Sequence, residues 1–462
     1  MVLKGLKMKA ISKAILFLLL LISLFYFSNL YAFDYVISVT QHKPANPPPP
    51  IPQRGIPFTD PDFGTTIVRL TDARTDPGGI GAYPQISLRY AKFSPENADE
   101  TRALLRTRGG TNWALYNVDR NSPTKYRFIK PITIPEAPNI AEPRWDGADP
   151  NIFYFPYEMK FCAYDIRTDK WTVIRDFSVD FLDKKYIFND DEGDSSADSR
   201  YWVWFLAYWQ GGELLKRGIF SWDKQANKIL GVLNVKDHIA RHGGGNWVSF
   251  TDTGKKIVIG SDYGQFKTCS YNPDFTNMVH LADYAGHSDT AIDADGNEVL
   301  FGFDFAGDSQ SMVRLSDGKT TKLLTRPWPN PRDWTGVSYG HSSGAHSVSK
   351  PGWGLYSSYS SGPVLNGSKF DAYLIYLMEL KDVGHQTLYG YDPNKVPKVW
   401  QIAHHYSSGC YEGQPHAVMN RKGTRIYFTS CWKIERTDCD YKNDAFDTYI
   451  IELPPNWYNK TQ

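Results

Sequence analysis

The sequence predicts an all-β protein, a seven-bladed β-propeller with four-stranded blades whose ring is closed by an N-terminal strand that completes the last blade. Three observations support this fold. After residue 64, short β-rich runs alternate with turns rich in Gly, Asp, Asn and Pro, and helical periodicity is scarce. A strand–turn–strand unit recurs seven times, and the last unit lacks its fourth strand. A β-sandwich or two smaller propellers are the alternative architectures.

The recurring unit is an inner strand, a turn with a small or acidic residue, a strong second strand, and two further strands. The turns, such as TDTG at 251–254 and ADGN at 294–297, occupy one place in the unit. A tight hairpin needs Gly or Asn at positive φ there. Radial repetition of four-stranded units is the pattern of a propeller. The seven units begin at Arg89, Arg144, Asp191, Gly245, His287, His346 and Gln414.

The closing strand is predicted from the two ends of the chain. The seventh unit ends with DTYIIELPP and has no fourth strand of its own. Residues 65–72, TTIVRLTD, precede the first inner strand without a local partner and resemble the fourth strand of the fifth unit. We therefore predict that 65–72 pairs with the strand around 448–453, which leaves no long unpaired edge.

The N-terminus has the order of a secretory signal: lysines, an apolar run at 14–27, and small residues up to Ala32. Residues 1–32 are predicted to be a cleaved signal peptide or an N-terminal membrane anchor, because the apolar run extended to 14–33 almost spans a bilayer. Residues 33–64 predict a Pro-rich spacer, and 65–462 the propeller. We expect the protein to be exported: periplasmic, extracellular or anchored to the outer face of the inner membrane.

Composition narrows the choice of partner. The chain has 51 Lys and Arg against 50 Asp and Glu, without a run of like charges, so nucleic acid is not an expected partner. Five cysteines without CxxC spacing argue against a zinc knuckle or a redox motif. The sequence also lacks a G-x-S-x-G elbow, a P-loop and a dinucleotide fingerprint. The oligomeric state is left open.

Histidines and acids gather before the inner strands, whose beginnings surround one mouth of the central channel in a propeller. Buried together, such imidazoles need acids or a metal as partners, and imidazole with an amide or carboxylate suits Mn, Zn, Fe or Ni. Aligned on their turns, the units bring to equivalent or neighbouring positions Glu192, His242, Trp247, His287, Asp289, His341, His346, His404, His405, Gln414 and His416.

The sequence of the repeating unit resembles that of the TolB-type propellers. The segment QPHAVMNRKGTRIYFTSCW from Gln414, with GHSD and SSGAHS in the fifth and sixth units, resembles the oligogalacturonate lyase branch of propeller polysaccharide lyases. In that family three histidines and a glutamine hold a catalytic metal, beside a histidine base and an arginine. The resemblance implies a divalent transition metal, Mn or else Zn, Fe or Ni, held by His287, His346, Gln414 and His416.

The same resemblance implies His242 as the base and Arg144 as the arginine. This chain departs from the family in one respect. The family separates its glutamine from a pair of histidines by more residues than Gln414-Pro415-His416 allows, and the second histidine of that pair is missing here.

Three alternatives for the function follow. The first is a metal-dependent lyase that cleaves an acidic oligosaccharide, or acts on another small polar ligand, by β-elimination. Its substrate would be bound by Trp247, Tyr83, Glu192 and Asp289, the two aromatic rings facing sugar rings. The second is a non-catalytic cell-envelope propeller that binds a partner or acts as a scaffold, because propellers host many unrelated roles. Another hydrolase or metal-dependent activity is a third alternative.

Overall fold

The computed structural model describes residues 48–77, 79, 84–108, 113–135, 143–189, 192–211, 213–234, 245–261, 267–303, 309–325, 340–358, 373–384, 397–407, 411–433, 444–454 and 457–458. The predicted signal or anchor segment, 1–32, and the first part of the predicted spacer lie outside these residues. Within them, no helix has both the length and the apolar character that a membrane span requires.

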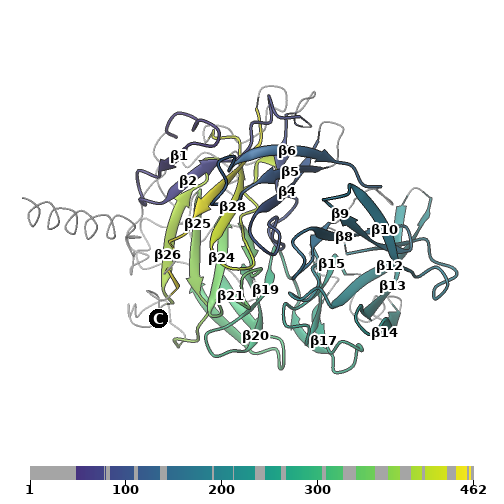
Figure 1. Ribbon diagram of the computed structural model, residues 1–462. Coiled ribbons are helices and arrows are strands. Elements are labelled where there is room, and N and C mark those ends of the chain that lie inside the picture. The colour runs from purple at the N-terminus through teal and green to yellow at the C-terminus, as the bar shows by residue number, and fades with distance from the viewer. Residues whose placement is uncertain are drawn as a thin grey trace, which may run out of the picture.

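Seven antiparallel sheets are arranged around a common centre (Figure 1), and in the first six the strands follow chain order from the centre outwards. Blade 1 consists of β3 (Ile86–Ser87), β4 (Arg102–Thr107), β5 (Trp113–Asn117) and β6 (Arg127–Ile132). Blade 2 consists of β7 (Arg144–Trp145), β8 (Ile152–Tyr157), β9 (Lys160–Asp165) and β10 (Lys170–Asp176). Blade 3 consists of β11 (Tyr186–Phe188), β12 (Tyr201–Gln210), β13 (Glu213–Asp223) and β14 (Lys228–Asn234).

The remaining blades repeat this order, and the predicted seven-bladed all-β fold is confirmed. Blade 4 consists of β15 (Trp247–Phe250), β16 (Ile257–Gly260), β17 (Thr268–Tyr271) and β18 (Val279–Ala282). Blade 5 consists of β19 (Asp289–Ile292), β20 (Glu298–Phe303), β21 (Ser309–Arg314) and β22 (Thr320–Thr325). Blade 6 consists of β23 (Gly340–Ser343), β24 (Trp353–Ser358), β25 (Leu374–Glu379) and β26 (Val399–His404). Blade 7 is built from β27 (Val418–Met419), β28 (Arg425–Ser430), β29 (Asp447–Glu452) and two strands from the N-terminal part of the chain, β1 (Pro57–Thr59) and β2 (Thr66–Arg69).

The turns between the first two strands of a blade have the backbone that their residues predict. Gly254 and Gly296, in the TDTG and ADGN turns, have φ of 72° and 82°. At Gly254 a Cβ would also lie 2.5 Å from the ring of Tyr201. Glycine therefore allows both the hairpin and the close contact between blades 3 and 4.

The ring is closed as predicted. β2 pairs antiparallel with β29, with Thr66 opposite Glu452 and Arg69 opposite Tyr449. Figure 1 shows the purple β1 and β2 beside the yellow strands of the C-terminal part. In addition, β1 pairs with β2 as a fifth strand, so the last part of the predicted spacer 33–64 packs on blade 7.

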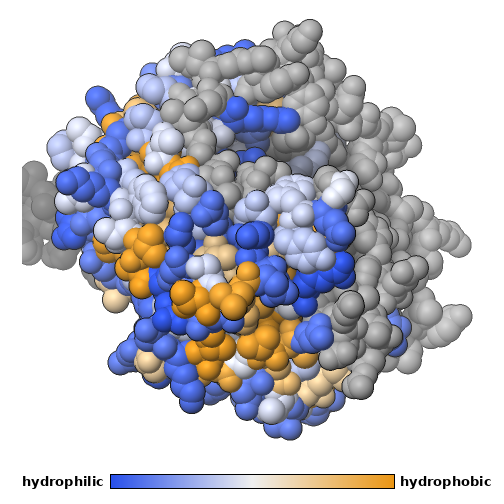
Figure 2. All heavy atoms as spheres, turned by 90° about the vertical axis from the view of Figure 1, so that its right-hand side faces the viewer, coloured by the Kyte–Doolittle hydropathy of each residue, from blue (hydrophilic) through white to orange (hydrophobic). Residues whose placement is uncertain are grey.

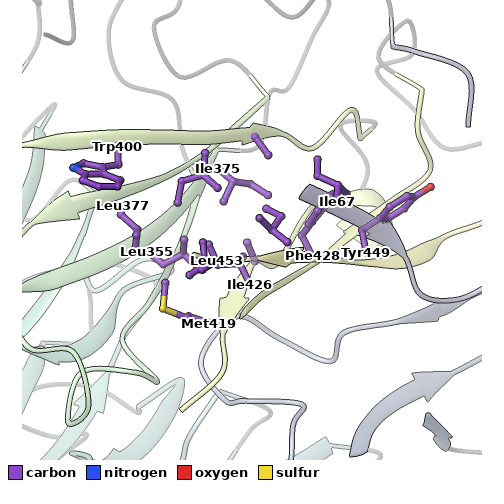
Figure 3. Close-up of a cluster of buried hydrophobic side chains, with 14 of the residues drawn as sticks. Ile67, Leu355, Ile375, Leu377, Trp400, Met419, Ile426, Phe428, Tyr449 and Leu453 are labelled. Atoms are coloured by element: carbon purple, nitrogen blue, oxygen red, sulfur yellow. The ribbon is translucent and has the colours of Figure 1, made fainter. Parts of the chain in front are cut away.

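The interface between blades 6 and 7 has an apolar core to which the closing strand contributes. Ile67 of β2 is fully buried in one cluster with Leu355, Ile375, Ile426 and Phe428, residues of the two blades (Figure 3). Burying an isoleucine side chain stabilises a fold by about 1.5–3 kcal/mol. The chain ends are therefore held together by packing as well as by strand pairing.

Charges at the same seam are paired. Arg69 donates from Nε and Nη2 to Oδ2 of Asp447, at 3.1 and 2.8 Å. The other carboxylate oxygen of Asp447 accepts from the hydroxyl of Thr71 and the amide of Ala73, at 2.9 and 2.8 Å. This carboxylate thus joins the N-terminal segment to blade 7.

The outer strands are less covered than the inner ones. On β10, Trp171, Val173 and Ile174 are exposed, and so is Val232 on β14. Figure 2 views the side of the molecule that carries β10, β13 and β14 and shows hydrophobic residues among hydrophilic ones. The charged residues of the inner strands, Arg144 on β7 and Asp289 on β19, are by contrast buried.

Candidate functional site

Three histidine rings and one tyrosine ring meet at the innermost strands of four blades. His287 precedes β19, His341 lies on β23, His416 precedes β27, and Tyr90 follows β3. The ring centroid of His341 lies 4.6 Å from that of His287 and 4.3 Å from that of His416. The Tyr90 hydroxyl lies 2.5 Å from Nδ1 of His287, and its ring lies 5.3 Å from that of His416. We call these four residues the His–Tyr cluster.

The histidines of the His–Tyr cluster are neutral at pH 7. Burial lowers the pKa of His341 well below its usual value of 6.5, and His416 and His287 lower it further. Burial also lowers the pKa of His416 to about 3, and the neighbouring His287 and Arg89 add to the effect. The pKa of His287 is lowered by burial too, although Glu192 opposes the shift. A neutral imidazole can accept a proton, so the cluster can act as a base.

The backbone around His416 is shaped by a short turn. The 3₁₀ turn η2 (Tyr411–Gly413) directs the chain towards β27, and the amide of Gln414 donates to the carbonyl of Tyr411 at 3.1 Å. His416 has φ of 42°, an uncommon conformation for a residue other than glycine. Nε2 of His416 and Oε1 of Gln414 are buried without a hydrogen-bond partner among the described residues. Strain and unsatisfied polar atoms together are typical of a functional site.

A buried cation lies next to the His–Tyr cluster. The Nζ of Lys92 lies 2.7 Å from Oε2 of Glu192 and 3.5 Å from the centre of the Trp247 ring. The positive charge of Lys92 helps to lower the pKa of His287 and His341. Trp247, predicted to face a sugar ring, is fully buried and is covered by Lys92. Glu192 serves as the counter-ion of Lys92.

Asp289 is a buried carboxyl at the start of β19. Its oxygens accept from the amides of Thr290 and Gly344, at 2.8 and 2.7 Å. Burial raises the pKa of Asp289 to about 7, against the opposing effects of Lys92 and the two amides. Asp289 therefore changes its charge near neutral pH.

Arg144 is held inside the ring by several contacts. Its Nε donates to the carbonyl of Gly193 at 3.0 Å and lies 3.6 Å from Oδ1 of Asp194. The guanidinium carbon lies 3.5 Å above the ring of Phe93. Arg144 thus joins blade 2 to the loop that precedes the second strand of blade 3.

The sequence-predicted site residues do not all meet at one point. His287 and His416 lie together in the His–Tyr cluster, with Gln414 two residues from His416. His346 lies elsewhere on blade 6, where its Nε2 is 3.1 Å from the carbonyl of Trp353. His242 and Tyr83 lie outside the described residues.

His341, Tyr90 and Lys92 had no predicted role. His341 was counted among the histidines near the mouth, but the alignment of turns gave the place in blade 6 to His346. Tyr90 and Lys92 stand in the expected inner strand of the first unit, RYAKF. A lysine between Ala91 and Phe93, both buried, is the signal that could have revealed the ion pair.

Metal binding can be tested against this geometry. Three imidazoles and an amide are a donor set that suits a transition metal. Among the residues that the structure describes, however, no group of three or more His, Cys, Asp or Glu side chains is placed to hold a metal ion. The expected metal on His287, His346, Gln414 and His416 therefore stays a prediction.

Comparison with solved structures finds similar propellers. An oligogalacturonate lyase from Vibrio parahaemolyticus matches with a TM-score of 0.55 and 11% identity, over 87% of this chain and 97% of that chain. An oligogalacturonate lyase in complex with manganese matches with a TM-score of 0.55 and 13% identity, over 89% and 99%. A TolB structure from Acinetobacter baumannii matches more loosely, with a TM-score of 0.33 and 13% identity, over 67% and 62%.

Comparisons by sequence find less. No family model matches the chain, and no curated protein matches it. At the identities of the structural matches, the likeness to the oligogalacturonate lyases shows that this chain shares their seven-bladed fold.

Proposed function

We propose that the protein is a lyase that cleaves an acidic oligosaccharide by β-elimination at the His–Tyr cluster. The observation that carries this proposal is the meeting of three neutral histidines with a tyrosine at the innermost strands of four consecutive blades. The fold shared with the oligogalacturonate lyases supports it, because their printed name states this class of reaction.

The reaction needs a base, charge neutralisation and a proton for the leaving group. The carbon next to a uronate carboxylate loses its proton only if the developing enediolate is neutralised. The C–H bond and the bond to the leaving oxygen break, and a carbon–carbon double bond forms. The leaving oxygen takes up a proton.

His416 is the proposed base among the described residues, because its Nε2 is buried and has no hydrogen-bond partner among them. A pKa of about 3 makes it a weak base in the free protein. A bound carboxylate nearby raises the pKa of an imidazole, so substrate binding would itself activate His416. His242, the base that the family resemblance implies, is a second proposal. A variant of His242 tests it in the same assay.

The proton for the leaving oxygen comes from the Tyr90–His287 pair in this proposal. The Tyr90 hydroxyl, which lies 2.5 Å from Nδ1 of His287, gives its proton to the leaving oxygen. The Tyr90 phenolate then takes up, through water, the proton that His416 removed from the carbon, and both side chains return to their starting states. Lys92 and Arg89 supply positive charge next to the histidines. A divalent metal, when bound, would supply further charge neutralisation.

The experiment is an assay of unsaturated product by ultraviolet absorbance, with purified protein and a panel of polyuronates and sulfated polyuronates. We expect one class of acidic polymer to be cleaved. His416→Asn and Tyr90→Phe should lower kcat by about 10²–10⁴-fold, the usual contribution of a proton-transfer group. His280→Asn is the control, because His280 is exposed on β18 and pairs with Asp283. Cleavage that is unchanged in His416→Asn and Tyr90→Phe would overturn the proposed roles.

Two further measurements test the expectations that go with this function. Elemental analysis of the purified protein tests the transition metal, and His346→Asn tests whether His346 takes part in holding it. N-terminal sequencing of protein from the producing cell tests export and cleavage after Ala32. If no polymer yields unsaturated product but an acidic oligosaccharide binds, the non-catalytic binding propeller takes the place of the lyase.

A further inference from the structure

The outermost strand of blade 2, β10, presents an exposed edge. It lies at the end of its sheet and pairs on one side only, with β9 (Figure 1). Residues 170–174 are all exposed, including the apolar side chains of Trp171, Val173 and Ile174. The amides and carbonyls on the free side of an edge strand can pair with another strand. β10 therefore offers both backbone hydrogen-bonding groups and apolar surface.

The other outer strands have features that hinder such pairing. β1 has three residues and contains Pro57, β6 contains Pro131, and β14 contains Gly231. β18 has four residues, Leu323 and Leu324 at the end of β22 are buried, and every residue of β26 is buried. Proline, short length and cover keep sheet edges from pairing, and glycine weakens a strand. Among the outer strands that the structure describes, only β10 combines five consecutive exposed residues with the absence of Pro and Gly.

One irregularity interrupts the pairing of β10 with β9. A bulge lies between Val173 and Arg175 and bends the strand there. The first four residues of β10 nevertheless pair with β9 in unbroken register, from Lys170 opposite Asp165 to Val173 opposite Cys162. The exposed half of β10 is therefore a regular strand.

The charges at the two ends of β10 identify the partner as a second copy of this chain. The strand begins with Lys170, which is exposed, and ends with Asp176. Val173 is its middle residue. Antiparallel pairing about a two-fold axis at Val173 brings Lys170 of each copy to the Asp176 end of the other. Opposite charges on facing strands stabilise a sheet, and like charges destabilise it. β10 is thus complementary to itself.

The loop after β10 adds apolar surface. Val179 and Leu182 are 70% and 84% exposed, and Leu182 lines the same surface hollow as Asp176. Anionic membranes are bound by clusters of free Lys and Arg side chains. Here the guanidinium of Arg175 is paired with Asp180, and the next cation along the loop is paired with Asp183. The surface therefore fits a protein partner better than a lipid one.

We propose that β10 is the dimer interface of this protein, through which two copies join their second blades edge to edge. The two four-stranded blades then form one continuous sheet. Such a contact uses the same surface on both copies, so it closes at two copies and does not extend into a filament. The proposal is independent of the proposed function. The His–Tyr cluster lies at the innermost strands, whereas β10 is outermost, so the cluster stays accessible in the dimer.

The test is sedimentation velocity of the full chain. We expect a dimer that dissociates on dilution within about 1–100 μM. Val173→Lys places two like charges at the two-fold axis and should weaken the dimer at least about tenfold. Val232→Lys is the matched control, because Val232 is an exposed apolar residue on β14, the outer strand of blade 3, and this variant should dimerise like the wild-type protein. Near-ultraviolet circular dichroism checks that both variants are folded.

Charge reversal tests the orientation of the two strands. Lys170→Asp should weaken the dimer, because it places two acids together at each end of the paired strands. Lys170→Asp/Asp176→Lys should restore it, because the opposite charges then face each other again.

Cross-linking tests the register without disturbing the charges. Facing Cα atoms of antiparallel strands lie about 4.5–5.5 Å apart, within the range that a disulfide spans. Under oxidation, Val173→Cys should therefore form a covalent dimer, and Val232→Cys should not.

Three results would overturn the proposal. The first is a wild-type protein that stays monomeric throughout this concentration range. The second is a dimer that Val173→Lys leaves intact and that Val173→Cys does not cross-link, since the copies would then meet elsewhere. The third is a monomer that binds vesicles of phosphatidylcholine and phosphatidylserine and loses this binding in Val173→Ser, which would make the surface a membrane contact.

Discussion

At the closing seam each of the main buried charges meets an opposite charge, whereas in the His–Tyr cluster at the channel mouth buried side chains of one kind face each other. In the seam, Asp447 accepts two hydrogen bonds from Arg69. Arg425, which is fully buried, forms ion pairs with Glu96 and Glu452. In the mouth, by contrast, the ring of His341 lies 4.6 Å from that of His287 and 4.3 Å from that of His416.

The paired charges of the seam and the neutral imidazoles of the His–Tyr cluster differ in how they affect stability. A buried ion pair with complete hydrogen bonding defines a unique geometry, and removing one partner is costly. Buried imidazoles, in contrast, are kept neutral by desolvation and gain little from one another. We therefore infer that the ion pairs of the seam fix its geometry, and that the His–Tyr cluster carries an energetic cost that the proposed activity would explain.

Removal of the closing strands is the strongest test of the seam. Deletion of residues 48–72 takes away β1 and β2, exposes the edge of β29, and removes Ile67 and Val68 from the core. We expect the cooperative unfolding transition, followed by near-ultraviolet circular dichroism in urea, to disappear. Ile51→Ser, a change at an exposed residue of the same segment, should leave the transition in place. A deletion variant that unfolds like the wild-type protein would show that the ring closes without this strand.

Removal of one seam charge comes next. Asp447→Ala leaves Arg69, the hydroxyl of Thr71 and the amide of Ala73 without their acceptor. We expect the free energy of unfolding to fall by about 3–5 kcal/mol, as for other broken buried pairs. Asp165→Ala is the matched control: the partner of Asp165, Arg167, is exposed, and little change is expected. If the two variants lost equal free energy of unfolding, the buried ion pair of the seam would matter no more for stability than an exposed one.

The fold could be predicted from the sequence because its signals are local and repeated. Strand runs and turns such as TDTG and ADGN recur at one place in the unit, and each of the first six blades pairs strands that are consecutive in the chain. The closing strand was predictable by exclusion, since 65–72 had no local partner. β1 was not predicted, because prolines in 47–57 favour an extended chain and do not show that Pro57–Thr59 pairs with β2.

The site was predictable only in part, because loop length is not set by strand periodicity. In blade 5 residues 293–297 join the first two strands, and in blade 6 residues 344–352 do so. Alignment of the units on their turns therefore assigned the inner position of blade 6 to His346. Because the connection in blade 6 is longer, His341 occupies that position. Tyr90 meets His287 only when blade 1 and blade 5 share a closed ring, and no local pattern encodes that contact.

Titration of Asp289, which lies at the channel mouth, is expected to change the free energy of unfolding less than Asp447→Ala does. Burial raises the pKa of Asp289 from 3.8 to about 7, so the folded protein keeps a proton that the unfolded chain has released. Its contribution to stability is full below about pH 4 and is lost as the pH rises through 7. Between about pH 5 and about pH 8, the wild-type protein should lose about 2–3 kcal/mol more than Asp289→Asn.

Urea unfolding at the two pH values measures this difference. Both proteins share the histidines of the mouth, whose lowered pKa values act in the opposite direction, so the difference between them isolates Asp289. Parallel pH profiles would mean that Asp289 ionises at its ordinary pKa.

The smallest expected effect on stability comes from His416, and it separates the mouth from the seam most directly. His416→Asn replaces one neutral side chain by another, so it uncovers no buried charge. Asparagine tolerates the φ of 42°. His416 also lines a small pocket together with Ser87 and Tyr411, so the lost ring volume opens into space that is already present. We expect the free energy of unfolding to change by no more than about 1 kcal/mol, within the range of mild substitutions, while the proposed activity falls. Met419→Ala, a change at a buried residue of the neighbouring strand β27, should cost about 2–5 kcal/mol by leaving a cavity. If His416→Asn destabilised the protein as much as Asp447→Ala does, His416 would be a structural residue like those of the seam, and the base of the proposed reaction would have to be sought elsewhere.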